Sequence, residues 1–347
     1  MSRFRVITSS IFIGIIFLLM GLYREIAASE ILDIIKVKED IYMAIGKKGE
    51  VVGANAAIII NEDDVTIVDT HISPKVAREL RQQVRKITEK PIKEVINTHF
   101  HLDHTDGNQV FSPVANIIGH VNTRQILLER GREHISSVQK RFRERIANGE
   151  RKLSSLKDEK EQQALKETIT YWSKFLAEVE MILPTLNITP PNLTLEKKIV
   201  LHKGKREIQI AFYGRGHTAG DVVVFLPQEK VLYSGDLLVS SGLPYMADGY
   251  ISEWVKTLTE IEQLGFETVI PGHGPVFKGK ELLKTFRSYL LALVAEVEKQ
   301  VKKGATLEQT LKEVQLPQFA DKFLNFSQGL AENVTKSYEE LSRKLSQ

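Results

Sequence analysis

The 347-residue sequence contains no cysteine, which excludes thiolate metal ligands, a thiol nucleophile, disulfide bonds and a lipid anchor on cysteine. Charge of one sign is also scarce, because 47 Lys and Arg residues nearly balance 44 Asp and Glu residues and leave a formal net charge of +3. Such a balance gives no electrostatic reason to expect nucleic acid as a partner. Low-complexity tracts and short repeats are absent from the sequence, and its 42% hydrophobic and 26% charged residues are typical of a globular protein.

The N-terminal segment carries an apolar run, Val6–Tyr23. Arg3 and Arg5 precede this run, and small residues suited to cleavage follow it. The layout predicts a secretory signal peptide over residues 1–28, and therefore an exported protein of the periplasm or the extracellular space. The alternative is an N-terminal anchor that stays uncleaved, which would be the chain's contact with a membrane.

The following segment alternates short apolar strands with helical patterns, which is typical of layered α/β proteins. Val51–Val52 and Val65–Val68 are among the predicted strands, and the second of these ends at Asp69. Ser73, followed by proline, is a predicted helix N-cap, and Lys93–Asn97 predicts the next strand. Because loops at strand ends carry the sites of layered α/β proteins, the residues after these strands are the candidates for chemistry.

Residues 124–183 change character and are strongly charged and helical. Asn148–Gly149 predicts a turn, so the segment is interpreted as a helical hairpin inserted between two halves of a domain. Its apolar seam can pack against the same domain or form a dimer interface. Residues 281–347 predict a C-terminal helical extension. The seam has heptad-like spacing and consists of Leu165, Ile169, Trp172, Leu176, Val179 and Leu183.

The most informative stretch is the run HFHLDH at residues 99–104. Its imidazole nitrogens and carboxylate oxygens suit a borderline ion such as Zn²⁺. His99 and His101 share one face of an extended backbone and can point at one ion. Asp103 and His104 then project differently and can reach a second ion. The alternative is a polar loop that happens to hold three histidines.

Three later segments add ligand-type residues, each just beyond a predicted strand and beside glycine. His217 lies in a glycine-rich loop, Asp236 follows the strand at 231–233, and His273 follows the strand at 268–270. Glycine allows the backbone to turn tightly around a compact centre. Either histidine alone can be a structural residue held by hydrogen bonds, but together with the first motif these residues supply ligands from elsewhere in the fold.

This ordered set resembles the metallo-β-lactamase superfamily over residues 35–280, with a glyoxalase-II-like ligand set. The resemblance implies an α/β fold, a four-layer αβ/βα sandwich that holds the helical hairpin as an insertion. It implies two zinc ions at one edge between the sheets, and Asp69 orienting the ligand loop. The implied ligands are His99, His101 and His217 for the first ion, Asp103, His104 and His273 for the second, and Asp236 as the bridge.

Two identities separate the chain from relatives within that superfamily. His101 stands where flavodiiron oxidoreductases carry glutamate, which disfavours redox chemistry on a diiron pair. Asp236 stands where one subclass of true β-lactamases uses cysteine, and it points to the glyoxalase-II-like and general hydrolase branches.

The ligand set therefore predicts hydrolysis of a carbonyl ester, thioester or amide in a small-molecule substrate, with β-lactams and lactones included. A metal-bound hydroxide would attack the carbonyl carbon, and Asp103 would both bind metal and accept a hydrogen bond from the nucleophilic water. One alternative is iron-dependent sulfur or oxygen chemistry of the persulfide dioxygenase type. Another is a partner-binding module that uses the hairpin at 124–183. The oligomeric state stays open.

Three further residues are candidates for substrate contact: His71, Asp248 and Trp254. The alternative for His71 is a surface or capping role, and the alternative for Trp254 is packing in the core. The remaining histidines are predicted to be structural at His120 and solvent-facing at His134 and His202.

Overall fold

The computed structural model describes residues 31–324 and 326–345. The predicted signal peptide at residues 1–28 lies outside the described residues. Within the described part, no helix combines the length and the apolar character needed to cross a bilayer.

The first sheet has seven strands that follow one another in sequence order across the sheet. The first four strands pair antiparallel, and β4 to β7 pair parallel. The carboxyl ends of β4 and β5 therefore lie at the same edge, where Asp69 and the run at residues 99–104 begin. The strands are β1 (Leu32–Lys38), β2 (Ile41–Gly46), β3 (Ala56–Ile60), β4 (Val65–Val68), β5 (Ile92–Ile96), β6 (Asn116–His120) and β7 (Leu193–Leu195).

The second sheet has six strands in the order β13-β12-β11-β10-β9-β8. Its neighbours pair antiparallel except β11 and β12, which run parallel and so bring Asp236 and His273 to one edge. The strands are β8 (Lys198–Lys203), β9 (Arg206–Phe212), β10 (Val222–Leu226), β11 (Val231–Tyr233), β12 (Thr268–Ile270) and β13 (Phe277–Lys278).

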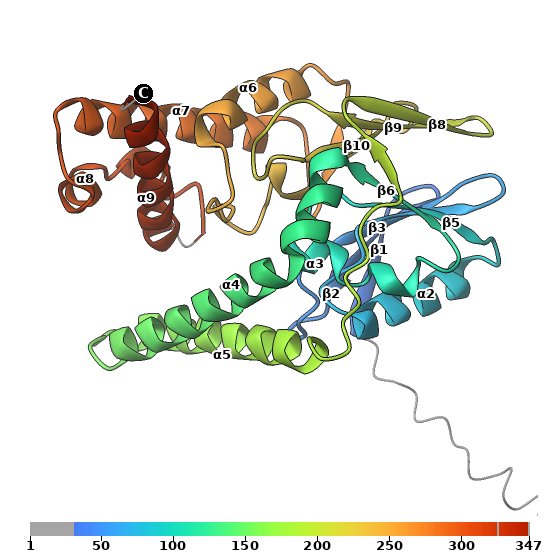
Figure 1. Ribbon diagram of the computed structural model, residues 1–347, viewed down its shortest axis with the longest axis horizontal. Coiled ribbons are helices and arrows are strands. Elements are labelled where there is room, and N and C mark those ends of the chain that lie inside the picture. Colours follow the sequence, from blue (N-terminus) through green and yellow to red (C-terminus); the bar gives the residue numbers. More distant parts are fainter. Residues whose placement is uncertain (1–30, 325, 346–347) are drawn as a thin grey trace, which may run out of the picture. The chain divides into compact units, whose positions relative to one another are not determined.

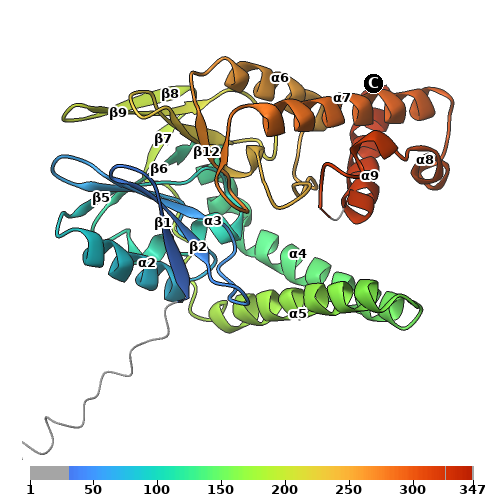
Figure 2. The same ribbon diagram turned by 180° about the vertical axis from the view of Figure 1, so that it is seen from behind.

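The two sheets lie face to face, with α2 on the outside of the first and α6 and α7 on the outside of the second (Figures 1 and 2). Three apolar clusters fill the spaces between these four layers, which confirms the expected αβ/βα sandwich. The helices, including single 3₁₀ turns, are α2 (Pro74–Ile87), α3 (Leu102–Thr105), α4 (Val121–Leu153), α5 (Glu159–Ile182), α6 (Ile251–Glu262), α7 (Glu281–Lys302), α8 (Leu307–Glu313), α9 (Phe326–Leu345), and the turns Asn108–Val110, Gly235–Leu237 and Pro317–Phe319.

Helix α2 begins as the sequence predicts. The Ser73 hydroxyl accepts a hydrogen bond from the Val76 amide, and Pro74 occupies the first turn, where its missing N–H costs nothing. Val76, Leu80 and Val84 lie on one face and are buried against the first sheet. By contrast, the predicted strand at Val51–Val52 is wrong, because these residues lie in the irregular loop between β2 and β3.

Helices α4 and α5 form the expected hairpin, but the predicted turn at Asn148–Gly149 is wrong. Both residues lie inside α4, which continues to Leu153. Gly149 serves close helix packing, since a Cβ there would lie 2.9 Å from the side chain of Ile169 on α5. The seam therefore packs within its own domain, and Phe142 and Phe175 stack across it with ring centroids 4.4 Å apart.

The C-terminal helices continue the outer layer of the second sheet. Apolar residues of α6, α7 and α9 share one buried cluster with residues of β10, β11 and β12. Tyr289 of α7 is fully buried there, and its hydroxyl accepts a hydrogen bond from the Asn333 side chain of α9. The segment after residue 280 is thus packed into the same core as the second sheet.

Candidate metal centre

The site is built where strands from both sheets end. Asp69 follows β4, the run at residues 99–104 follows β5, His217 follows β9, and Asp236 and His273 follow β11 and β12. Hydrogen bonds join these loops. The Val222 amide donates to the Thr98 carbonyl of the other sheet at 2.8 Å, and the Gly272 amide donates to the Gly235 carbonyl of the neighbouring strand's loop at 2.9 Å. The ligand-type side chains are thereby held together by backbone contacts that do not depend on those side chains.

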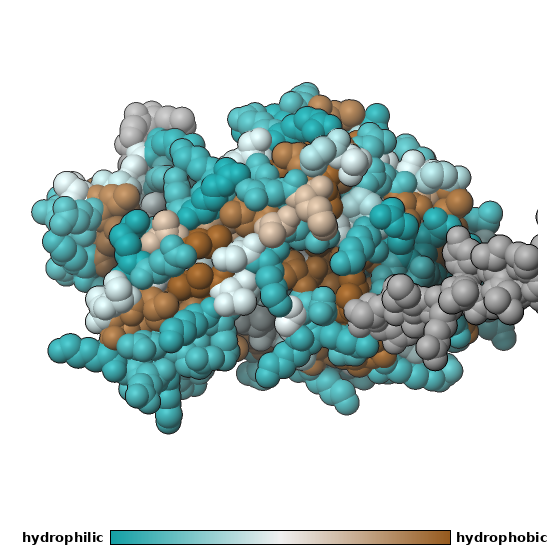
Figure 3. Space-filling model, turned by 90° about the horizontal axis from the view of Figure 1, so that it is seen from below, coloured by the Kyte–Doolittle hydropathy of each residue, from teal (hydrophilic) through white to brown (hydrophobic). Residues whose placement is uncertain are grey.

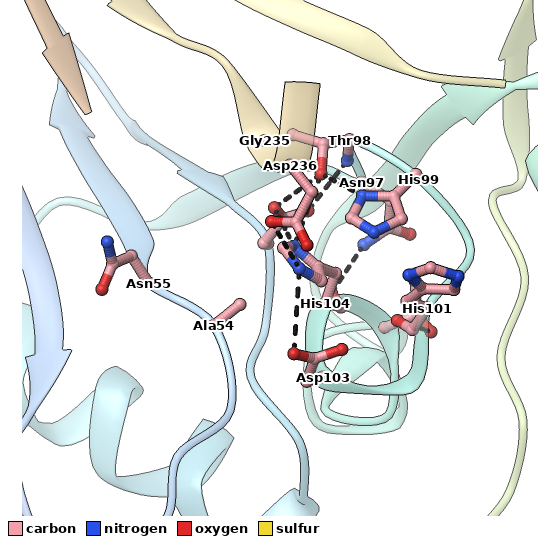
Figure 4. A network of polar contacts seen from close by, with 12 residues as sticks. Ala54, Asn55, Asn97, Thr98, His99, His101, Asp103, His104, Gly235 and Asp236 are labelled. Atoms are coloured by element: carbon pink, nitrogen blue, oxygen red, sulfur yellow. Dashed lines mark hydrogen bonds and ion pairs between the residues drawn. The ribbon is translucent and has the colours of Figure 1, made fainter. Parts of the chain in front are cut away.

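The first group of candidate ligands is His99, His101, His217 and Asp236, all buried, with ligand atoms within 4.8 Å of one another. His217 Nε2 lies 2.9 Å from His101 Nδ1 and 3.4 Å from Asp236 Oδ2. Figure 4 shows the side chains of His99, His104 and Asp236 pointing toward a common point, with His101 beside them.

The second group is Asp103, His104 and His273. His273 Nε2 lies 3.3 Å from Asp103 Oδ2 and also 3.3 Å from Asp236 Oδ2. The Asp236 carboxylate therefore lies between the two groups, in contact distance of His217 on one side and His273 on the other. The two groups divide the candidate ligands as the resemblance implies, and Asp236 lies between them.

The donor set fits metal ions. Two ligand atoms about 2.0–2.1 Å from a tetrahedral ion lie about 3.3 Å apart. One pair in each group comes close to this separation, with 2.9 Å between His217 Nε2 and His101 Nδ1 and 3.3 Å between His273 Nε2 and Asp103 Oδ2. Several buried nitrogen and oxygen atoms that could bind metal also have no hydrogen-bond partner among the described residues, as expected for metal-ligand atoms. These atoms are Nε2 of His99, Nε2 of His104 and Oδ1 of Asp236.

The charges of the cluster call for cations. Burial alone would lower the pKa of His104, but the carboxylates of Asp69, Asp236 and Asp103 raise it well above its ordinary value. His273 is only partly buried, and the same Asp236 and Asp103 raise its pKa to about 10. Burial opposes ionisation of Asp236, but His273 and His104 lower its pKa well below the ordinary value. Protons on imidazoles thus balance these carboxylates, and metal ions would replace those protons.

Asp69 is at the centre of the network that supports the ligand loop. Its Oδ1 accepts a hydrogen bond from the Thr98 amide at 2.8 Å, and its Oδ2 lies 2.7 Å from His104 Nδ1. The Tyr233 hydroxyl also donates to Oδ2 at 3.1 Å. Asp69 adopts a φ of 59°, a left-handed conformation that Asp tolerates better than most residues. Asp69 thus contacts the ligand loop at Thr98 and His104, and its contact with His104 Nδ1 leaves His104 Nε2 facing the cluster.

Glycine at position 272 is required by close approach. A Cβ there would lie 1.9 Å from Asp236 Oδ1 and 2.8 Å from the Gly235 carbonyl carbon. The backbone of the loop after β12 therefore lies directly against the Asp236 carboxylate.

We expect Gly272→Ala to displace the Asp236 carboxylate and to lower kcat/KM by about a hundredfold, since small misplacements of reacting groups are costly. Steady-state kinetics with zinc analysis on the same samples would measure the effect. Gly265→Ala is the matched control, because a Cβ at Gly265 meets no atom within 4 Å. Full activity and full metal content in Gly272→Ala would contradict this assignment.

The structure corrects two of the candidates for substrate contact. Trp254 is fully buried in the outer core, where its ring packs edge-to-face on Phe286, and it forms no wall of a substrate pocket. His71 is also fully buried, and its Nδ1 contacts the Ala54 carbonyl at 2.7 Å. Burial lowers the pKa of His71 to about 4, which keeps the ring neutral in this position.

Asp248 contacts a candidate ligand. Its Oδ2 lies 3.0 Å from His101 Nε2, so it can fix the orientation of that ring and leave Nδ1 free for an ion. His134 was predicted to face solvent, and that prediction is wrong. Its ring stacks on that of His101 at a centroid distance of 5.2 Å, because α4 crosses over the ligand loop. His120 and His202 lie as predicted, the first capping α4 and the second exposed.

A cavity of about 510 Å³ opens beside the cluster. On one side it reaches His101, Asp103, Asp236 and His273, and on the other it is walled by the hairpin. Sequence patterns did not identify these hairpin residues as part of a site, because their apolar spacing serves equally for packing between helices. They include Val138, Arg141, Phe142, Arg145, Tyr171, Trp172 and Phe175.

Comparison with known proteins gives sequence matches that cover this site. A sequence model described as the metallo-beta-lactamase superfamily matches residues 49–273. A metallo-beta-lactamase type 2 from Bacillus cereus is 25% identical over 243 residues, which cover 68% of this chain and 73% of that protein. A linear primary-alkylsulfatase from a Pseudomonas species is 23% identical over 272 residues, which cover 74% of this chain and 48% of that protein.

Solved structures agree on the fold. A metallo-beta-lactamase from Pontibacter korlensis aligns with a TM-score of 0.54 and 20% identity, and the alignment covers 75% of this chain and 99% of that one. The DIM-1 metallo-beta-lactamase aligns with a TM-score of 0.53 and 23% identity, covering 75% and 97% of the two chains. The remaining quarter of this chain lies outside these alignments and is additional to the sandwich that the structures share.

Proposed function

This chain belongs to the metallo-beta-lactamase superfamily of metal-dependent hydrolases, and we propose that it is an exported enzyme that holds two zinc ions and cleaves a carbonyl ester, thioester or amide. The observation that carries the proposal is the position of Asp236, whose Oδ2 lies 3.4 Å from His217 Nε2 and 3.3 Å from His273 Nε2. A carboxylate so placed can bridge two ions, each with its own histidines.

Zinc fits the donor set, which consists of imidazoles and carboxylates without any thiolate. When bound, two zinc ions would supply an activated water molecule and polarise the substrate carbonyl. His99, His101 and His217 would hold one ion, and Asp103, His104 and His273 the other.

The chain's own residues then position the ligand rings and transfer a proton to the leaving group. Asp69 and Asp248 fix the rings of His104 and His101. Asp103 lines the cavity, and its carboxylate can accept a hydrogen bond from the attacking water. The water oxygen bonds to the carbonyl carbon, the bond to the leaving oxygen, sulfur or nitrogen breaks, and the leaving group takes up a proton that Asp103 can relay.

The test is a hydrolysis panel on zinc-loaded protein. It contains a chromogenic β-lactam, an acyl-homoserine lactone, an S-acyl glutathione and a primary alkyl sulfate, the last because one relative is named as an alkylsulfatase. We expect turnover of at least one carbonyl substrate, and a loss of at least about a hundredfold in kcat/KM in His101→Ala. Undiminished activity in His101→Ala, or one iron and no zinc in the active protein, would reject the proposal.

Export rests on the apolar run and flanking arginines within residues 1–28. Cell fractionation of the full chain, with mass spectrometry of its mature N-terminus, tests export and cleavage together. A mature protein that keeps residues 1–28 in the membrane fraction would favour the anchor instead.

A further inference from the structure

The cavity beside the metal centre has an aromatic wall made by the hairpin. Phe142 of α4 and Phe175 of α5 stack at an interplanar angle of 11°, and Tyr171 and Trp172 of α5 line the same space. The face of the molecule seen from below shows a band of apolar side chains bordered by polar ones (Figure 3). A cavity of about 510 Å³ with such a lining suits the apolar part of a small molecule.

Two arginines stand one helical turn apart in this apolar wall, and their surroundings differ. The Arg145 guanidinium lies 2.5 Å from Glu332 Oε2 of α9, so its charge is balanced within the protein. The Arg141 guanidinium lies over the Tyr245 ring, 4.4 Å from its centroid. Among residues 31–324 and 326–345, no carboxylate lies within ion-pair distance of Arg141. The charge of Arg141 lowers the pKa of Asp248, but the Asp248 carboxylate is in contact with His101 and lies beyond ion-pair distance of Arg141.

The Arg141 guanidinium is half-buried, rests on an aromatic ring and has no carboxylate within ion-pair distance. It can therefore bind an anion from outside the protein through charge-assisted hydrogen bonds. The other acidic residue of the lining outside the metal cluster is Glu50, which is exposed at the rim. Anionic groups are therefore attracted to the Arg141 end of the cavity.

We propose that the substrate of this site is an amphiphilic anion, whose apolar group packs on the aromatic wall of the hairpin and whose negative group pairs with Arg141. The inference rests on the proposed function in taking this ligand to be the substrate. It names Arg141 as a specificity-determining residue, and it explains why the arginine beside it on the helix, Arg145, is neutralised by Glu332 while Arg141 is not.

The first test measures binding and needs no turnover. Isothermal titration calorimetry on zinc-loaded protein compares octanoate, octanol and acetate, and we expect octanoate to bind most tightly. In Arg141→Gln, the affinity for octanoate should fall about tenfold or more, since hydrogen bonds to charged groups contribute that much. Arg141→Lys keeps the charge but loses the bidentate geometry, and should fall between the two.

Arg143→Gln is the matched control, because Arg143 lies on the same helix but is exposed and paired with Glu180. It should bind octanoate as the wild type does. Melting curves confirm that each variant is folded. Wild-type affinity for octanoate in Arg141→Gln, or equal affinity for acetate and octanoate in the wild type, would overturn the inference.

A second test uses two esters of equal length, one ending in a carboxylate and one in a methyl group. The ratio of their kcat/KM values should favour the carboxylate in the wild type and fall about tenfold or more in Arg141→Gln. If no ester is hydrolysed but Arg141→Gln still lowers the affinity for octanoate, the hydrolase proposal fails and the assignment of the anion site stands. If esters are hydrolysed with an unchanged ratio, the anion site fails and the hydrolase proposal stands.

Discussion

Replacing Asp236 by asparagine is expected to lower kcat/KM by at least about a thousandfold, because one carboxylate serves both halves of the metal centre. Its Oδ2 lies between His217 and His273, and its Oδ1 lies 3.4 Å from His104 Nε2. An amide keeps the shape but not the charge, so we expect zinc content to fall from two ions per chain to one or fewer. Steady-state kinetics and elemental analysis of the same preparation measure both effects.

The matched control is Asp63→Asn, which changes an exposed carboxylate in the turn before β4 and should leave activity and metal content as they are. Thermal melting separates loss of metal from loss of fold. An Asp236→Asn protein that keeps two ions and most of its activity would show that Asp236 does not bridge.

Removal of metal is the second large effect that we expect. A chelator should abolish hydrolysis and lower the melting temperature by about 5–10 °C, because ligands at a thousand times their Kd stabilise the folded state by about 4 kcal/mol. The physical reason is that the carboxylates of Asp103, which is partly buried, and Asp236, which is buried, lose their cations and must share protons with His104 and His273.

Differential scanning calorimetry before and after chelation measures the shift, and added zinc should restore both activity and melting temperature. The control is a triple variant that lacks three candidate ligands, with His104, His217 and His273 each replaced by alanine. Its melting temperature should not change on chelation. A wild-type protein that hydrolyses its substrate and melts at the same temperature after metal removal would refute the metal centre.

Local sequence signals predicted the parts of the fold that local chemistry decides. The cap of Ser73 and the spacing of Val76, Leu80 and Val84 fix helix α2, and both features hold in the structure. The ligand residues also follow their strands as expected, because side chains at strand ends are displayed by the sheet itself. The division of seven candidate ligands into two groups came from the superfamily resemblance, and the structure brings the same residues together in two groups.

Tertiary packing decided the features that the sequence did not reveal. Asn148–Gly149 is a residue pair typical of turns, but it lies within α4, where Gly149 allows α5 to approach closely at Ile169. His134 sits among charged neighbours in sequence and yet stacks on His101, because α4 crosses the ligand loop. The role of Arg141 likewise depends on Tyr245, which lies more than a hundred positions later in the chain. Such pairs leave no periodic pattern in one sequence.

The most direct measurement is X-ray diffraction from crystals of the zinc-loaded protein on both sides of the zinc absorption edge. We expect two anomalous peaks, one within about 2.0–2.2 Å of the nitrogens of His99, His101 and His217, and one at the same distance from Asp103, His104 and His273. The Asp236 carboxylate should contact both. A single peak held by other residues, or none in protein that is active, would contradict the two-ion centre.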